Sequence, residues 1–69
     1  MKFIKTLSGI YLNAATIENL KVEDETVEAW VQGDNESPYE IKTFEDAETA
    51  QGYLAALVVE LGSVVNADL

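Results

Sequence analysis

Alternation of apolar and polar residues is the clearest structural signal in the chain. From Thr26 to Gln32 the apolar Val27, Ala29 and Val31 alternate with Glu28, Trp30 and Gln32, which is typical of a strand with one buried face. Shorter runs of β-favouring residues lie on both sides of this segment. The sequence predicts strands at Phe3–Leu7, Ile10–Leu12, Ile17–Val22, Thr26–Gln32 and Tyr39–Thr43.

Residues that favour turns separate the predicted strands. Ser8-Gly9 and Asp24-Glu25 predict tight turns, and Asn13–Thr16 predicts a corner. Gly33–Pro38 contains nearly every loop-forming residue type, so it predicts a longer loop. Short connections favour antiparallel neighbours, and the sequence therefore predicts an antiparallel β-meander of four to five strands.

An apolar stripe with helical spacing follows the last predicted strand. Thr43 and Asp46 approximate a capping box, and Gly62 is a natural stop. We expect an α+β domain over residues 1–62, in which one C-terminal helix packs on one sheet face, and a frayed tail over residues 63–69. The apolar residues of the stripe recur every three or four positions: Ala47, Ala50, Leu54, Leu57 and Leu61. The sheet residues expected to face this stripe, with Phe44 closing one end, are Leu20, Val22, Val27, Ala29, Val31, Tyr39 and Ile41.

Net charge limits the choice of partner. The chain has 13 acidic residues, four lysines and a net charge of −9, with a pI of about 4.1. Nucleic-acid binding needs basic side chains to neutralise phosphates, so we expect no nucleic-acid partner. Anionic membranes are disfavoured for the same reason. A protein with a basic surface suits the charge better.

Residue types that carry most catalytic and metal chemistry are missing. The sequence contains no Cys, no His and no Arg, which excludes disulfides and the usual zinc sites and leaves few groups for proton transfer. We therefore expect a non-enzymatic protein without a cofactor or metal. One alternative stays open, because the acids of Glu23–Glu25 or Asp34–Glu36 have oxygen ligands suited to Ca²⁺.

Neither end of the sequence predicts a membrane segment. The N-terminal apolar stretch is interrupted by Lys5, Thr6 and Ser8, so we interpret it as a strand and not as a signal peptide. The apolar run Leu54–Val59 is far shorter than the roughly 20 residues of a membrane span. We expect a cytoplasmic protein.

Trp30 is the main candidate for an interface residue. Alternation places it on the sheet face away from the predicted helix, where Ile4, Tyr11 and Ile17 would complete an apolar patch. Packing against neighbouring strands is the alternative explanation for Trp30. An open five-stranded sheet also has two edges that invite pairing with another chain. We therefore predict a homodimer.

Some segments resemble known small β-meander proteins. Ile10-Tyr11-Leu12-Asn13, Ile17-Glu18, the Val-rich strand after an acidic turn, and Tyr39-Glu40-Ile41-Lys42 before a helix resemble the FlbD-type flagellar proteins over about the first fifty residues. A similar order occurs in the DNA-binding domains of LytTR-type response regulators. The resemblance implies a β-meander followed by a helix, and we carry over no functional residue from it.

Two functions fit these observations. The first is a non-enzymatic protein-interaction module that self-associates, of the kind encoded by bacteria or their phages. The second is a nucleic-acid mimic, in which carboxylates such as Glu18, Glu28 and Glu40 imitate phosphates and block a DNA-handling enzyme. An apolar patch would favour the module, and a regular band of acids would favour the mimic.

Overall fold

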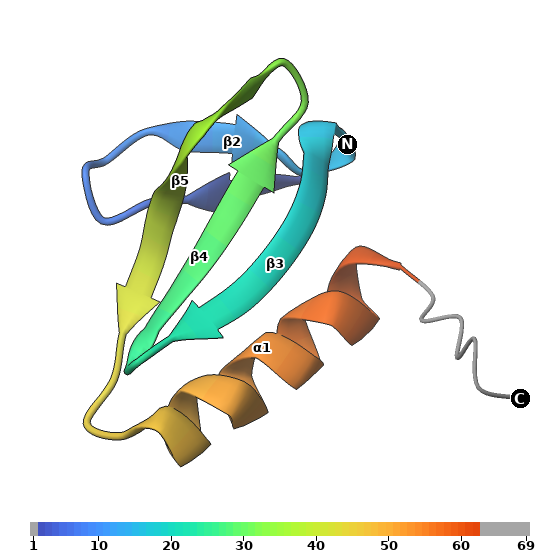
Figure 1. Ribbon diagram of the computed structural model, residues 1–69. Coiled ribbons are helices and arrows are strands. Elements are labelled where there is room, and N and C mark those ends of the chain that lie inside the picture. The colour runs from blue at the N-terminus through green and yellow to red at the C-terminus, as the bar shows by residue number, and fades with distance from the viewer. Residues whose placement is uncertain (1, 63–69) are drawn as a thin grey trace, which may run out of the picture.

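The central layer of the protein is a three-stranded antiparallel sheet in the order β3-β4-β5 (Figure 1). The computed structural model describes residues 2–62, with the side chains of Asp34 and Asn35 left aside. Val27, Ala29 and Val31 are buried as the alternation predicts, because they point to the covered face. The strands span Ile17–Glu23 (β3), Thr26–Val31 (β4) and Asp34–Thr43 (β5).

The first two strands form a sheet of their own, so the expected single five-stranded sheet is wrong. β1 (Phe3–Lys5) pairs antiparallel with β2 (Tyr11–Asn13). The predicted corner is a short 3-10 helix, η1 (Ala14–Thr16), in which the Asn13 side chain accepts a hydrogen bond from the Ala15 N–H. This turn redirects the chain before β3 begins, and the hairpin therefore crosses the three-stranded sheet and does not extend it.

The connection after β4 is a tight turn, which corrects the predicted loop over Gly33–Pro38. Gln32 and Gly33 form the turn, and Gly33 has a φ of +82°, a conformation that glycine adopts without steric cost. β5 then runs from Asp34 through Pro38, and its pairing with β4 is irregular between Ala29 and Val31. The residues that predicted a loop therefore lie in the first part of β5. The interrupted register of this part of the strand explains why Pro38 is tolerated there.

The C-terminal helix, α1 (Ala47–Leu61), is present as predicted. Asp46 is its N-cap, and the Asp46 carboxylate accepts a 2.7 Å hydrogen bond from the Thr49 N–H. Thr43 instead ends β5, where its hydroxyl lies 3.0 Å from the Thr26 hydroxyl. The capping residue is thus Asp46 alone, and the helix begins one turn later than a Thr43 cap would place it.

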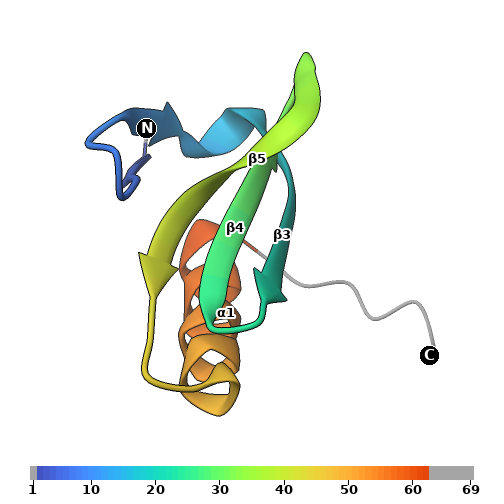
Figure 2. The same cartoon turned by 60° about the vertical axis from the view of Figure 1, so that its left-hand side comes forward.

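Hairpin and helix cover the same face of the three-stranded sheet, and the core lies between them. Figures 1 and 2 show both elements on one side of the sheet, and no other helix or strand of residues 2–62 covers the opposite face. The predicted packing of the helix on one sheet face is confirmed. No helix within residues 2–62 has the length and apolarity that a membrane span requires. The tail predicted over residues 63–69 lies outside the described residues. The buried apolar residues are Ile4, Leu12, Val27, Ala29, Val31, Ile41, Ala50 and Leu57.

Candidate protein-interaction surface

The four residues predicted to form one interface lie in three different places. Trp30 is half-buried on the uncovered sheet face, and Tyr11 is 64% exposed on the hairpin. Ile4 is 7% exposed and belongs to the core. Ile17 packs against the core from the helix side. The prediction that Ile4 and Ile17 share the face of Trp30 is therefore wrong.

Strand pairing explains the position of Ile4. Ile4 lies opposite Leu12, and both side chains point into the core, whereas Lys5 lies opposite Tyr11 on the other face. Because β1 and β2 form a separate sheet, the face that bears Ile4 and Leu12 belongs to the common core with residues of β4 and α1. Sequence alternation identifies the two faces of the hairpin but not the face that docks on the core.

The outward face of the hairpin carries exposed aromatic and basic side chains. We call Phe3, Lys5 and Tyr11 the hairpin surface. Phe3 is 55% exposed, and the Lys5 Nζ lies 6.0 Å from the centroid of the Tyr11 ring, at the outer limit of a cation–π contact. Leu7 and Ile10 at the hairpin tip are also exposed. Four of the five large apolar side chains found exposed among residues 2–62 therefore belong to this one hairpin.

Hydrogen bonds fix the tip of the hairpin. The side chain of Thr6 is buried, and its hydroxyl accepts a 3.1 Å hydrogen bond from the Ile10 N–H and lies 3.0 Å from the Ser8 hydroxyl. The Leu7 N–H donates a 2.9 Å hydrogen bond to the Glu40 carbonyl, which ties the tip to the edge of β5. The exposed apolar side chains are thus presented on an ordered scaffold, and little conformational entropy is left to lose on binding.

Charge is divided between the hairpin and the rest of the chain. All 13 acidic residues follow Ile17, whereas Lys2 and Lys5 are two of the four lysines. The first 17 residues therefore carry a formal charge of +2, and the remaining residues, with 13 acids and two lysines, carry −11. The Lys2 ammonium donates to the Glu60 carbonyl at the end of the helix. An apolar, weakly basic hairpin is attached to a strongly acidic body.

The uncovered face of the three-stranded sheet is acidic, whereas the hairpin is weakly basic. We call Lys21, Glu28, Trp30 and Glu40 the sheet surface. Glu28 lies directly opposite Glu40 on one side and Lys21 on the other. Like charges at directly opposed positions destabilise a sheet. The Lys21 ammonium bonds at 3.0 Å to Glu23, and this hydrogen bond and charge raise the pKa of Lys21. The two glutamates thus give this face a local negative charge beside an aromatic side chain.

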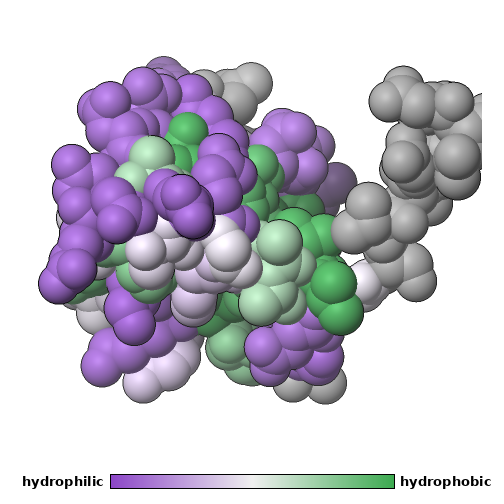
Figure 3. Space-filling view, turned by 90° about the horizontal axis from the view of Figure 1, so that it is seen from below, coloured by the Kyte–Doolittle hydropathy of each residue, from purple (hydrophilic) through white to green (hydrophobic). Residues whose placement is uncertain are grey.

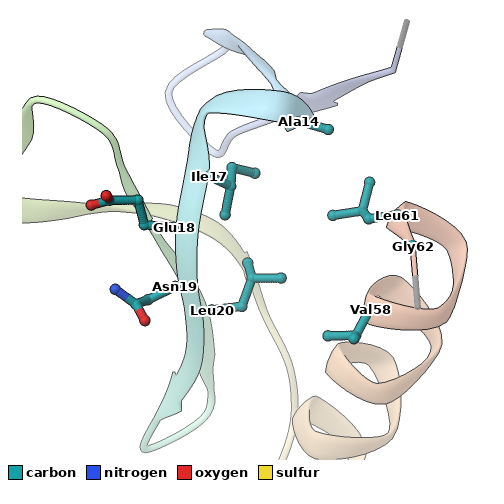
Figure 4. A pocket seen from close by; sticks show the side chains of 8 residues that line it. All are labelled: Ala14, Ile17, Glu18, Asn19, Leu20, Val58, Leu61 and Gly62. Carbon is teal, nitrogen blue, oxygen red and sulfur yellow. The ribbon is translucent and has the colours of Figure 1, made fainter. Parts of the chain in front are cut away.

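A shallow groove with apolar side chains along its floor runs between β3 and the end of α1. Figure 4 shows Ile17 and Leu20 pointing toward Val58 and Leu61, while Glu18 points away. The groove has a volume of about 440 Å³, and Glu18 and Asn19 also belong to its lining. On the helix itself Val59 is 71% exposed. Figure 3, which shows the molecule from below the view of Figure 1, has apolar side chains at the surface among hydrophilic ones.

The acidic turns are the candidates for the carboxylate cluster that a cation site needs. No three carboxylates among the side chains described within residues 2–62 converge on a common point. Glu23, Asp24 and Glu25 are exposed at or beside the turn between β3 and β4, and Glu23 is paired with the Lys21 ammonium. The side chains of the second acidic segment, Asp34–Glu36, are described only at Glu36.

Comparison with protein-family models, curated proteins and solved structures found no match. The resemblance to the FlbD-type proteins therefore stays a prediction.

Sequence reasoning missed Phe3, Leu7 and Ile10 as exposed residues. Two signals were available: the N-terminal hairpin has apolar residues on both of its alternating faces, and no acid precedes Glu18. A two-stranded hairpin can bury only one face against the rest of a small domain, so an apolar residue on its other face stays exposed.

Proposed function

We propose that this protein is a non-enzymatic, self-associating protein-interaction module that binds through its first hairpin. The observation that carries the proposal is the outward display of Phe3 and Tyr11 on an acid-free hairpin whose other face is buried. Exposed aromatic side chains are enriched at binding hot spots because they bury a large area at low entropic cost.

Self-association fits the size of the domain. A chain of 69 residues buries only about 60% of the surface that its unfolded form exposes, and oligomerisation is a common supplement at this size. The cytoplasmic location expected from the sequence belongs to the same proposal, supported by a net charge that keeps a small domain dispersed in a crowded solution.

Light scattering over a dilution series tests the proposal. We expect the wild-type mass to rise above the 7.6 kDa monomer at tens to hundreds of micromolar, as is usual for small interfaces. The double variant Phe3→Ser, Tyr11→Ser should remain a monomer. Val59→Ser removes an equally exposed apolar side chain from the helix and should behave as the wild type. A double variant that associates as strongly as the wild type would contradict the proposal.

The nucleic-acid mimic is the second candidate, and the Glu28–Glu40 pair favours it. These carboxylates are adjacent on an uncovered face at a cost to the sheet, as phosphate mimics would be. Lys21 interrupts the band beside Glu28. If the protein is a mimic, Glu28→Gln with Glu40→Gln should relieve inhibition of a DNA-handling enzyme, whereas Phe3→Ser with Tyr11→Ser should leave inhibition unchanged.

A further inference from the structure

The hairpin surface and the sheet surface have complementary chemistry. The hairpin surface presents Phe3, Lys5 and Tyr11 in a segment without acids. The sheet surface presents Trp30 on the same face as Glu28, and Glu28 lies directly opposite Glu40. Each surface therefore offers an aromatic group. The hairpin surface is net positive through Lys5, and the sheet surface is net negative because Glu28 and Glu40 outweigh Lys21.

The two surfaces point in opposite directions. The hairpin lies on the helix side of the three-stranded sheet, as Figures 1 and 2 show, and Ile4 and Leu12 fill the space between the two layers. The outward face of the hairpin therefore lies on one side of the molecule, and the sheet face that bears Trp30 lies on the opposite side.

We propose that the hairpin surface of one molecule docks on the sheet surface of a second copy, head to tail. This inference rests on the proposed self-association and specifies its geometry. A two-fold contact of hairpin with hairpin would bring both copies of Lys5 together, and a contact of sheet with sheet would bring both pairs of glutamates together. Only the mixed contact pairs opposite charges, which selects it over the symmetric ones.

Head-to-tail docking predicts assemblies larger than the homodimer expected from the sequence. Because the two complementary surfaces lie on opposite sides, two molecules joined by one head-to-tail contact leave one hairpin surface and one sheet surface unused. Contacts of this heterologous kind generate rings or open chains. The mass should therefore keep rising with concentration beyond that of a dimer, and it should fall at high salt, which screens the charged contacts.

Charge reversal with mixing tests the inference. Lys5→Glu reverses the charge of the hairpin surface alone, and Glu40→Lys reverses a charge of the sheet surface alone. Both residues are exposed. Each variant alone should associate at least about tenfold more weakly than the wild type, because like charges then meet across the contact. An equimolar mixture should recover the mass, since each surface finds a partner of opposite charge on the other variant. Glu25→Lys makes the same charge change as Glu40→Lys, but at an exposed turn outside both surfaces, and this variant should associate as the wild type does.

Three results would overturn head-to-tail docking: a wild type that stops at a dimer, a Glu40→Lys variant that associates as the wild type, or a mixture that stays monomeric. If the double variant Phe3→Ser, Tyr11→Ser still abolishes association in these cases, the hairpin remains the binding surface and only the geometry fails. A wild type that is monomeric at every concentration overturns both proposals. Circular dichroism of each variant establishes that it is folded, and Lys5→Gln with Glu40→Gln replaces any reversal that is not.

Discussion

The two isoleucines of the first hairpin should respond in opposite ways to the same substitution. Ile4 is 7% exposed and Ile10 is 49% exposed, although only five residues lie between them in one hairpin. Replacing Ile4 by Ala removes three buried carbon atoms at about 0.8 kcal/mol each, or roughly 2.4 kcal/mol. The cavity left behind brings the expected loss to about 2–4 kcal/mol.

This loss is large for so small a domain. A chain of 69 residues has a total stability of roughly 3–10 kcal/mol, and each kcal/mol lowers the Tm of a domain of this size by about 4–8 °C. Ile4→Ala should therefore lower the Tm by roughly 10–25 °C. Ile10→Ala exposes little new surface and leaves no closed cavity, so it should cost about 1 kcal/mol or less.

Urea unfolding followed by the fluorescence of the single Trp30 measures both effects. Equal shifts of the midpoint for the two variants would refute the docking of Ile4 into the core. A small shift for Ile4→Ala together with weakened self-association would restore Ile4 as an interface residue, as alternation alone suggested.

Two further predictions use matched substitutions. Gly33→Ala should destabilise the protein by about 1–2 kcal/mol because Gly33 has a φ of +82°. Gly52→Ala should stabilise it by up to about 1 kcal/mol, since Gly52 lies inside α1 with no atom within 4 Å of an added Cβ. If urea unfolding shows that both variants change the free energy of unfolding in the same direction, this explanation of the two glycines is refuted. The hydrogen bond from the Thr49 N–H lowers the pKa of Asp46 below its ordinary 3.8, so this group stabilises the fold fully above that value and loses its contribution as pH falls through the lowered pKa. The stability difference between wild type and Asp46→Ala should therefore shrink in acid, whereas the difference between Asp46→Asn and Asp46→Ala should not, and a wild-type difference that stays constant down to acidic pH would refute the cap.

The sequence predicts the elements of this fold well because their signals are local. Alternation along β4 identifies its buried face, and the spacing of Ala50 and Leu57 identifies the buried face of α1. The arrangement of the hairpin is not local. It depends on the path that η1 imposes between β2 and β3 and on the hydrogen bond from Leu7 to Glu40, a residue far along the chain.

The same difference explains the errors at the candidate site. Ile4 and Tyr11 are both apolar residues in short strands, and nothing near either residue says which one meets the core. Turn propensity also misled over Gly33–Pro38, because Asp34 pairs with Val31 and β5 stays extended through residues that favour loops. Tertiary contacts override local preference at these positions.

The position of the hairpin links the stability of the protein to its proposed activity. An isolated two-stranded hairpin is marginal in water, so β1 and β2 need one face buried to stay ordered. Ile4 and Leu12 supply that face, and pairing then fixes Lys5 and Tyr11 on the other. Substitutions on the inner face should therefore weaken folding and association together, because an unfolded hairpin presents nothing. Substitutions on the outer face should weaken association alone, and this separation is the behaviour expected of a surface built for binding.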